Sequence, residues 1–146
     1  MKEKKSKKIL IAIFFIALIL DQISKIISYA NGWNINMDNS NNGYYIIMTI
    51  IIVLMIIRYI SNDNTFIKMD TKVILTLAMS GGIGNLVDRI WYKNVIIFMD
   101  FGKGICLNLS YIYILIAWIG LAGILTKNKM KILKEKKVKK NEYKNK

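Results

Sequence analysis

Ser80-Gly81-Gly82-Ile83-Gly84-Asn85-Leu86-Val87-Asp88-Arg89 ends one of the apolar runs of this chain, and Asp100-Phe101 follows eleven residues later. On an α-helix, Asn85, Asp88 and Arg89 lie at positions i, i+3 and i+4 and therefore share one face. That face must meet protein or water, because charged groups are costly in hydrocarbon. The glycines allow another helix to approach closely. The stretch predicts a polar site between packed helices or, alternatively, a glycine-packed helix whose charged end reaches the membrane surface.

The composition indicates a membrane protein whose charge lies outside its apolar segments. The 146 residues are 54% hydrophobic and yet carry a formal net charge of +13. Ten lysines lie between Lys127 and Lys146, and five lie between Lys2 and Lys8. A nucleic-acid-binding domain would spread its positive charge over a folded face. We therefore expect no nucleic-acid partner, and we expect these lysines to face anionic membrane lipids.

Several kinds of site are excluded by residues that the chain lacks. It contains no histidine, which excludes Ser-His-Asp and Cys-His catalysis and any histidine-ligated metal. Its one cysteine, Cys106, excludes an internal disulfide and a thiolate cluster. We expect no metal and no cofactor, and any catalysis must rely mostly on carboxylate, amide, hydroxyl or lysine groups.

Four apolar runs approach the length of about 20 residues that crosses a bilayer as a helix. They predict an all-α membrane protein with four transmembrane helices at about 9–27, 44–60, 73–89 and 107–125. The run from Val95 to Met99 predicts a small extracytoplasmic strand or interfacial segment. Residues 1–146 then form a single integral membrane domain with basic cytoplasmic tails at 1–8 and 126–146. We expect the second tail to be disordered beyond its first turn or two.

The distribution of basic residues predicts the orientation in the membrane. We place both termini and the loop between the second and third helices in the cytoplasm. That side then holds 18 of the 22 lysines and arginines: five in the first tail, ten in the second tail and three at the loop. Polar residues from several segments then gather at the outer face, where we expect them to line one outward-opening cavity. They are Asp21, Asn85, Asp88, Arg89, Asp100 and Asn108. Lys25 follows Asp21 at i+4, so this pair forms either an interfacial ion pair or part of the wall of the site.

In this order and topology, the motifs resemble those of the lipoprotein signal peptidases, also called signal peptidase II. Asp21-Gln22-Ile23-Ser24-Lys25 matches the family's Asp-Gln-x-Ser/Thr-Lys, and Gly84-Asn85-Leu86-Val87-Asp88-Arg89 matches its Gly-Asn-x-x-Asp-Arg. Asn41-Asn42-Gly43 is similar to its Asn-x-Gly, and Asp100-Phe101 is similar to the end of its Val-Asp-Phe. Leu107-Asn108-Leu109-Ser110 is similar to the start of its Phe-Asn-x-Ala-Asp.

The resemblance implies a multi-pass protein of the bacterial cytoplasmic membrane, with its site at the outer face. Such a protein is an aspartic endopeptidase that removes signal peptides from diacylglyceryl-modified prolipoproteins, so its partners are lipidated signal peptides and membrane lipids. Asp100 corresponds to the family's first catalytic aspartate. The other matching positions would bind substrate or form a structural polar cluster; they are Asp21, Lys25, Asn41, Gly43, Asn85, Asp88, Arg89 and Asn108.

The sequence departs from the family where the second catalytic aspartate is expected, because Tyr111 follows Ser110. Two carboxylates that share a proton can activate water and hydrogen-bond the scissile carbonyl. A tyrosine is protonated at neutral pH, so it can donate to a carbonyl but cannot share a proton in this way. Asp88 is the nearby carboxylate that could substitute, although it more readily pairs with Arg89.

Three functions remain open on these residues. The first is an active or weakly active endopeptidase for lipoprotein precursors. The second is a catalytically impaired relative that binds lipidated signal peptides or a membrane partner without cleaving. The third, a structural or transport protein, fits the composition but leaves the ordered motifs without a reason. Tyr111 predicts that cleavage is poor or absent.

Overall fold

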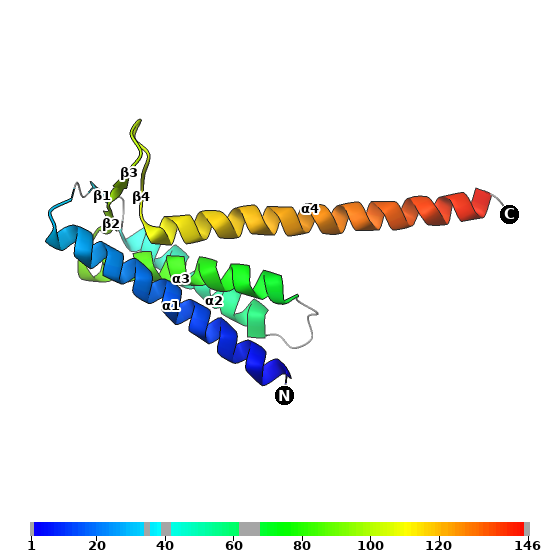
Figure 1. Cartoon of the computed structure of the whole chain (residues 1–146), viewed down its shortest axis with the longest axis horizontal. Helices are drawn as coiled ribbons and strands as arrows, with labels where there is room; N and C mark the ends of the chain where they lie inside the picture. The colour runs from blue at the N-terminus through cyan, green and yellow to red at the C-terminus, as the bar shows by residue number, and fades with distance from the viewer. Residues whose placement is uncertain (1, 34–35, 39–41, 62–67, 145–146) are drawn as a thin grey trace.

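Four long helices build the structure, a computed structural model that describes residues 2–33, 36–38, 42–61 and 68–144 (Figure 1). In chain order the elements are α1 (Lys2–Ala30), β1 (Asn36–Asp38), α2 (Asn42–Ser61), α3 (Met69–Trp91), β2 (Val95–Ile97), β3 (Met99–Asp100), β4 (Cys106–Leu107) and α4 (Leu109–Lys144). All four helices contain a segment that is long and apolar enough to cross a membrane. The predicted fold class, four membrane helices with a small β segment, is confirmed.

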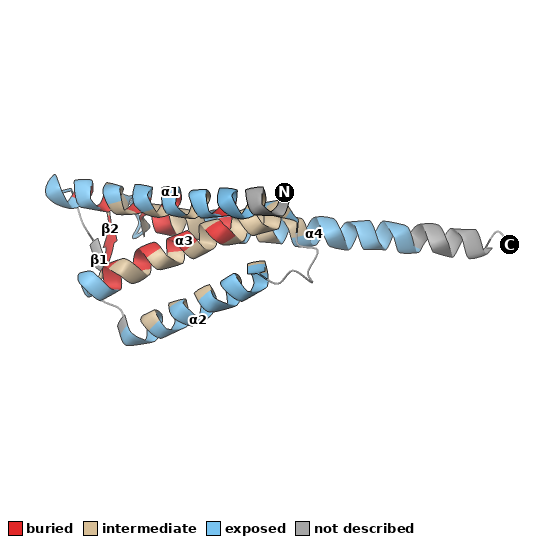
Figure 2. Cartoon of the chain, turned by 90° about the horizontal axis from the view of Figure 1, so that it is seen from below, coloured by how far each residue is buried: buried red, intermediate tan, exposed pale blue. Residues whose placement is uncertain are grey.

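α3 is the central helix of the bundle, since it packs against α1, α2 and α4. Figure 2 shows buried positions along α3, whereas α2 is exposed over most of its length. The buried residues of α3 are small or polar, namely Thr76, Ser80, Gly81, Gly84, Asn85, Asp88 and Arg89. Large apolar side chains such as Ile16 and Leu54 point outward instead. This arrangement is expected for helices whose outer surface meets lipid.

Two glycines of α3 allow the neighbouring backbones to approach. A Cβ atom on Gly81 would lie 2.5 Å from the carbonyl oxygen of Ser110 in α4. A Cβ atom on Gly84 would lie 2.6 Å from Asp21 Oδ2 in α1 and would also clash with the Ser110 hydroxyl. Real Cβ atoms do not approach other atoms so closely. The absence of a side chain at both positions therefore brings α1, α3 and the start of α4 together.

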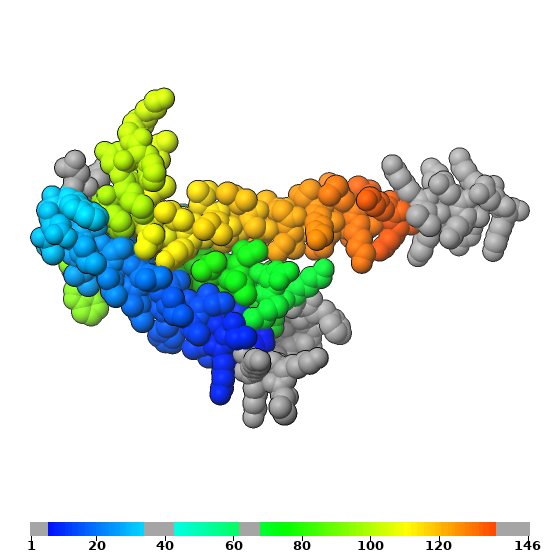
Figure 3. Space-filling view, in the orientation of Figure 1, coloured from blue at the N-terminus to red at the C-terminus, as the bar shows by residue number. Residues whose placement is uncertain are grey.

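Two small antiparallel sheets lie at the end of the bundle where α4 begins (Figure 1). β1 pairs with β2, and β3 pairs with β4 so that Asp100 lies opposite Cys106. The turn of the β3–β4 hairpin contains Gly102 and Gly104, whose φ angles of 74° and 78° favour glycine. The short strand expected within 95–99 is thus present, and the hairpin stands clear of the bundle (Figure 3).

α4 continues well past the predicted end of the fourth membrane helix. The sequence predicts disorder in most of 126–146, but the helix extends to Lys144. That expectation is wrong because the segment contains no proline and no glycine after Gly123, while lysine, leucine, methionine and glutamate are good helix formers. Residues 125–136 are exposed, and beyond Asn128 this part of α4 extends away from the other helices as a rod (Figure 3).

We predict that Gly84→Ala destabilises the bundle by about 1–3 kcal/mol, the usual range for adding bulk to a packed interior. The new methyl group would meet Asp21 and Ser110, which both lie on neighbouring helices. Gly123→Ala is the matched control, because a Cβ atom there meets nothing within 4 Å. Thermal unfolding in detergent measures both variants. Equal unfolding midpoints for the two would contradict the role given to Gly84.

Candidate active site

The ammonium group of Lys25 is the centre of a buried hydrogen-bonded cluster. Lys25, in α1, is 1% exposed, and its Nζ lies 2.6 Å from Asp21 Oδ2 and 2.8 Å from Asp88 Oδ2. It also donates to Asn85 Oδ1 at 3.2 Å. An ammonium group has three N–H donors, so these three acceptors match its capacity. The i, i+4 spacing predicted the pair with Asp21, and the structure adds two partners from α3.

The two carboxylates of the cluster have further partners. Asp88 Oδ2 accepts the backbone N–H of Ile96 at 3.2 Å, and Asp88 Oδ1 accepts the side-chain amide of Gln22 at 3.3 Å. Asp21 Oδ1 accepts the backbone N–H of Ser110 at 2.8 Å. Because Ser110 lies in the first turn of α4, the Asp21 carboxylate is also at the positive end of that helix dipole. These contacts compensate two carboxylates that are 0% exposed.

Asn108 joins the cluster to β2 and to the start of α4. Its side-chain amide donates to Asn85 Oδ1 and to the carbonyl oxygen of Ile96, both at 2.9 Å. Its side-chain oxygen accepts the backbone N–H of Tyr111 at 2.8 Å, which makes Asn108 the N-cap of α4. We call the connected residues the Lys25 cluster; its members are Asp21, Lys25, Asn85, Asp88 and Asn108.

The Lys25 cluster is closed, which corrects the expectation that its residues line an outward-opening cavity. Its five members are between 0% and 8% exposed. Asp88 has contacts with Lys25, Gln22 and Ile96, so it is poorly placed to replace a catalytic aspartate. Within the described ranges, no three aspartate, glutamate, cysteine or histidine side chains come together as metal ligands would. The geometry suits a cluster that holds helices in place.

The remaining positions of the predicted polar set lie at the contact of α3 with α2 or near the start of α2. Arg89 is buried, and its guanidinium lies over the ring of Tyr45, 4.6 Å from the ring centre. Such a cation–π contact holds the first part of α2 against the end of α3. Gly43 is exposed in the first turn of α2, and Asn41 lies outside the described residues.

Asp100, the predicted catalytic aspartate, lies on the exposed hairpin and not in the buried Lys25 cluster. It is the last residue of β3, and its Oδ1 accepts the backbone N–H of Gly102 at 2.7 Å. Its strand partner Cys106 and the half-buried Tyr111 line the same hollow, whose volume is 400 Å³. The hairpin therefore places an accessible carboxylate on the strand next to Cys106, which lines the same hollow as the tyrosine.

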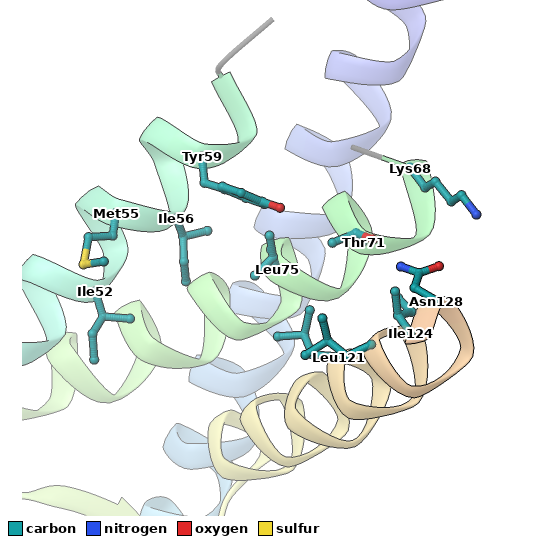
Figure 4. A pocket seen from close by; sticks show the side chains of 11 residues that line it. Ile52, Met55, Ile56, Tyr59, Lys68, Thr71, Leu75, Leu121, Ile124 and Asn128 are labelled. Carbon is teal, nitrogen blue, oxygen red and sulfur yellow. The ribbon is translucent and has the colours of Figure 1, made fainter. Parts of the chain in front are cut away.

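Two further apolar hollows continue from this point along α4. One, of 280 Å³, shares Ile114 and Trp118 with the hollow at Tyr111 and is also lined by Gly82 of α3. The other, of 760 Å³, lies between α2, α3 and α4 and reaches Asn128 (Figure 4). These two share four lining residues, Ile52, Ile56, Leu75 and Leu121. We call these three neighbouring hollows, which share lining residues, the apolar track.

The apolar track is the feature that sequence reasoning missed. Its wall on α2 includes Ile52 and Ile56, which belong to a helix without a polar stripe. The sequence of such a helix predicts contact with lipid on all sides. A groove forms only where the helix is separated from its neighbour, and the sequence does not give that separation. Gly82 is the one local signal, since it removes bulk from the wall of the track, but the same residue also suits close helix packing.

Comparison with known proteins relates the chain to one enzyme family. The family model for signal peptidase (SPase) II matches residues 29–127. The lipoprotein signal peptidase of Buchnera aphidicola subsp. Baizongia pistaciae (strain Bp) is 30% identical over 121 residues, which cover 64% of this chain and 74% of that protein.

Two solved structures of a bacterial membrane enzyme, determined by the in meso method at 2.3 and 1.9 Å resolution, have the same fold. Their TM-scores are 0.74 and 0.73, each at 21% sequence identity. The matches cover 84% and 81% of this chain and 90% and 92% of theirs.

We predict that Lys25→Met destabilises the protein by about 3–5 kcal/mol, the usual effect of removing one partner of a buried ion pair. Asp21 and Asp88 would lose their shared counter-ion. Adding Asp88→Asn should recover part of the loss, because one of the two uncompensated charges is then removed. Lys8→Met removes an exposed lysine from the same helix and should change little.

Thermal unfolding in detergent, together with the yield of folded protein, measures these variants. A Lys25→Met protein that unfolds at the same temperature as Lys8→Met would show that the Lys25 cluster contributes no such stability. A double variant less stable than Lys25→Met alone would show that the carboxylates do not depend on this ammonium group.

Proposed function

Because the chain belongs to the signal peptidase II family, we propose that it is a membrane endopeptidase that removes the signal peptides of lipid-modified precursor proteins. The observation that carries the proposal is the apolar track, which follows α4 and ends at Tyr111. The strand that carries Asp100 pairs with the strand that lines this end of the track. One end of a substrate helix bound in the track would then lie near the carboxylate of Asp100 and the phenol of Tyr111.

The dimensions and lining of the apolar track suit a signal-peptide helix. Between Asn128 and Tyr111, α4 rises by about 26 Å at 1.5 Å per residue, close to the ~30 Å thickness of a hydrocarbon core. Its walls are mostly apolar, and Gly82 permits close approach of another helix. An apolar segment bound there would stay at membrane depth, and its cleavage site would reach the membrane surface beside the hairpin.

We assign the catalytic carboxylate to Asp100 and the carbonyl-binding hydroxyl to Tyr111. Asp100 would take a proton from a water molecule as the water oxygen attacks the carbonyl carbon of the scissile amide. Tyr111 would donate a hydrogen bond to the carbonyl oxygen as negative charge develops on it. The carbon–nitrogen bond then breaks, and the proton held by Asp100 passes to the departing amine. Water is consumed, and a carboxylic acid and an amine are formed.

The substitution of tyrosine for a second aspartate leads us to expect slow cleavage. Tyr111 donates a hydrogen bond but does not share a proton with Asp100 as a second carboxylate would. Members of a catalytic unit act together, so the loss of one removes much of the rate. The Lys25 cluster supports this chemistry from a distance, because Asn108 caps the helix that carries Tyr111 and holds β2 in place.

The chain is a multi-pass membrane protein by its family and its four apolar helices. We further propose that both termini lie in the cytoplasm and that Asp100 lies at the outer face of the bacterial cytoplasmic membrane. The start of α1 and the lysine-rich end of α4 lie on the side opposite the hairpin (Figure 1). Basic residues favour the cytoplasmic side, which supports this orientation.

We predict that Asp100→Asn removes most cleavage of a lipid-modified precursor peptide by the purified protein. Tyr111→Phe should lower the rate by about tenfold to a thousandfold, as for other hydrogen-bond donors to a developing oxyanion. Tyr111→Asp should raise the rate, because it restores a second carboxylate. Asp70→Asn, which changes an exposed carboxylate in the first turn of α3, is the control.

Cleavage that persists in Asp100→Asn would show that another group activates the water. Tight binding of the precursor by the parent protein without any cleavage, even in Tyr111→Asp, would instead support a protein that only binds signal peptides.

We predict the orientation from cysteine labelling in intact cells. In a Cys106→Ser background, Phe101→Cys on the exposed hairpin should react with a membrane-impermeant thiol reagent. Lys129→Cys, in the exposed extension of α4, should react only after lysis. Labelling of Lys129→Cys from outside, with protection of Phe101→Cys, would reverse the proposed orientation.

A further inference from the structure

A separate cavity lies at the end of the bundle opposite the hairpin. It is formed by the start of α1, the end of α2 and the start of α3, and none of its described lining residues also lines the apolar track. Its volume is 340 Å³. Small-molecule sites usually measure about 300–1,000 Å³, so the cavity is large enough for part of a ligand.

The lining of this cavity changes from cationic to apolar with depth. Lys7 of α1 and Lys72 of α3 lie at the mouth of the cavity, which is the end nearest the helix termini. The hydroxyl-bearing residues Ser6 and Ser61 lie there as well. No acidic residue is among its described lining residues. The deeper wall is formed by Leu10, Ile11, Phe14, Phe15, Ile57 and Met79. Phe14 follows Lys7 by seven positions of α1, which corresponds to about 10 Å of depth along the helix.

The start of α3 adds positive charge to the mouth of the cavity. The N-cap residue Lys68 makes no side-chain cap hydrogen bond, and Ser6 of the cavity wall donates to Met69 Sδ at 3.0 Å in the first turn of α3. The positive end of the α3 dipole therefore lies beside the two lysines, whereas Asp70 in the same turn is exposed and is not among the described residues that line the cavity. A lysine in the first turn of a helix is unfavourable for the helix itself. Lys72 is nevertheless half-buried at this position, where an anion would offset its charge.

We propose that this cavity binds one anionic phospholipid, with its phosphate between Lys7 and Lys72 and one acyl chain along the apolar wall. Basic pockets between membrane helices are suited to anionic headgroups, and the depth of the apolar wall suits an acyl chain rather than a free phosphate. A zwitterionic phospholipid has the same chains but no net charge, so it should bind less tightly. The site is independent of Asp100 and Tyr111, and its test does not use cleavage.

Lipid titration of the purified full chain in neutral detergent, followed by native mass spectrometry, tests the proposal. The probes are phosphatidylglycerol, phosphatidylcholine with the same acyl chains, and inorganic phosphate. We expect one phosphatidylglycerol per chain at low lipid concentration and weaker binding of phosphatidylcholine. Inorganic phosphate at the same concentration should not displace the bound lipid, because it lacks the acyl chain.

The double variant Lys7→Gln, Lys72→Gln should weaken phosphatidylglycerol binding by roughly fivefold for each lysine removed. The matched control is Lys8→Gln, Lys68→Gln, which removes the same charge from the same two helix starts at exposed positions that do not line the cavity. This control should bind within about twofold of the parent protein. Three of the four lysines are exposed and Lys72 is half-buried, and each substitution keeps a polar side chain, so both proteins should fold.

Equal losses in the two double variants would overturn the proposal, because the lysines would then act only through net charge. Equal affinity for the two phospholipids would exclude recognition of an anionic headgroup. Displacement by inorganic phosphate at the same concentration would show a phosphate site without an acyl-chain site.

Discussion

The packing of helices α1, α3 and α4 depends on the buried ammonium group of Lys25. A charge at membrane depth needs partners, and Lys25 finds them in Asp21 of its own helix and in Asp88 and Asn85 of α3. Asp21 in turn accepts the backbone N–H of Ser110, so the start of α4 is tied to the same group. Two apolar helix faces gain little free energy by packing against each other in lipid, because the lipid tails are equally apolar. These directional contacts therefore determine how α1, α3 and α4 are placed.

The Lys25 cluster and the proposed catalytic residues, Asp100 and Tyr111, lie in different parts of the structure. The buried residues hold the start of α4 and strand β2, whereas Asp100 lies on the exposed hairpin and Tyr111 at the end of the apolar track. The charged groups of the Lys25 cluster are thus kept out of the path of an apolar substrate, where Lys68 is the charged residue among the described lining residues. The accessible Asp100 lies on the strand that pairs with the wall at the end of that path. α2 contributes a wall of the track, and the contact between Arg89 and Tyr45 holds its first part against α3.

The helices were predictable because apolar runs of spanning length alternate with polar segments. The spacing of Asn85 and Asp88 predicted one polar face, and both residues belong to the Lys25 cluster. Spacing does not reveal whether a neighbouring helix closes such a face. Here Gly84 lets α1 and α4 approach so closely that the face is buried, and its described side chains contact one another instead of solvent. The apolar track was not predictable, because it depends on the separation of α2 from α4 and not on the residues of either helix.

If a substrate helix occupies the apolar track, photo-crosslinking detects it directly. A benzophenone amino acid placed at Leu121, inside the track, should crosslink a lipid-modified precursor in membranes. The same group at Ile16, which is 59% exposed on α1 and does not line the track, should crosslink lipid and give no precursor adduct above background. Equal precursor adducts at the two positions, or an adduct at Ile16 alone, would contradict a substrate path along α4.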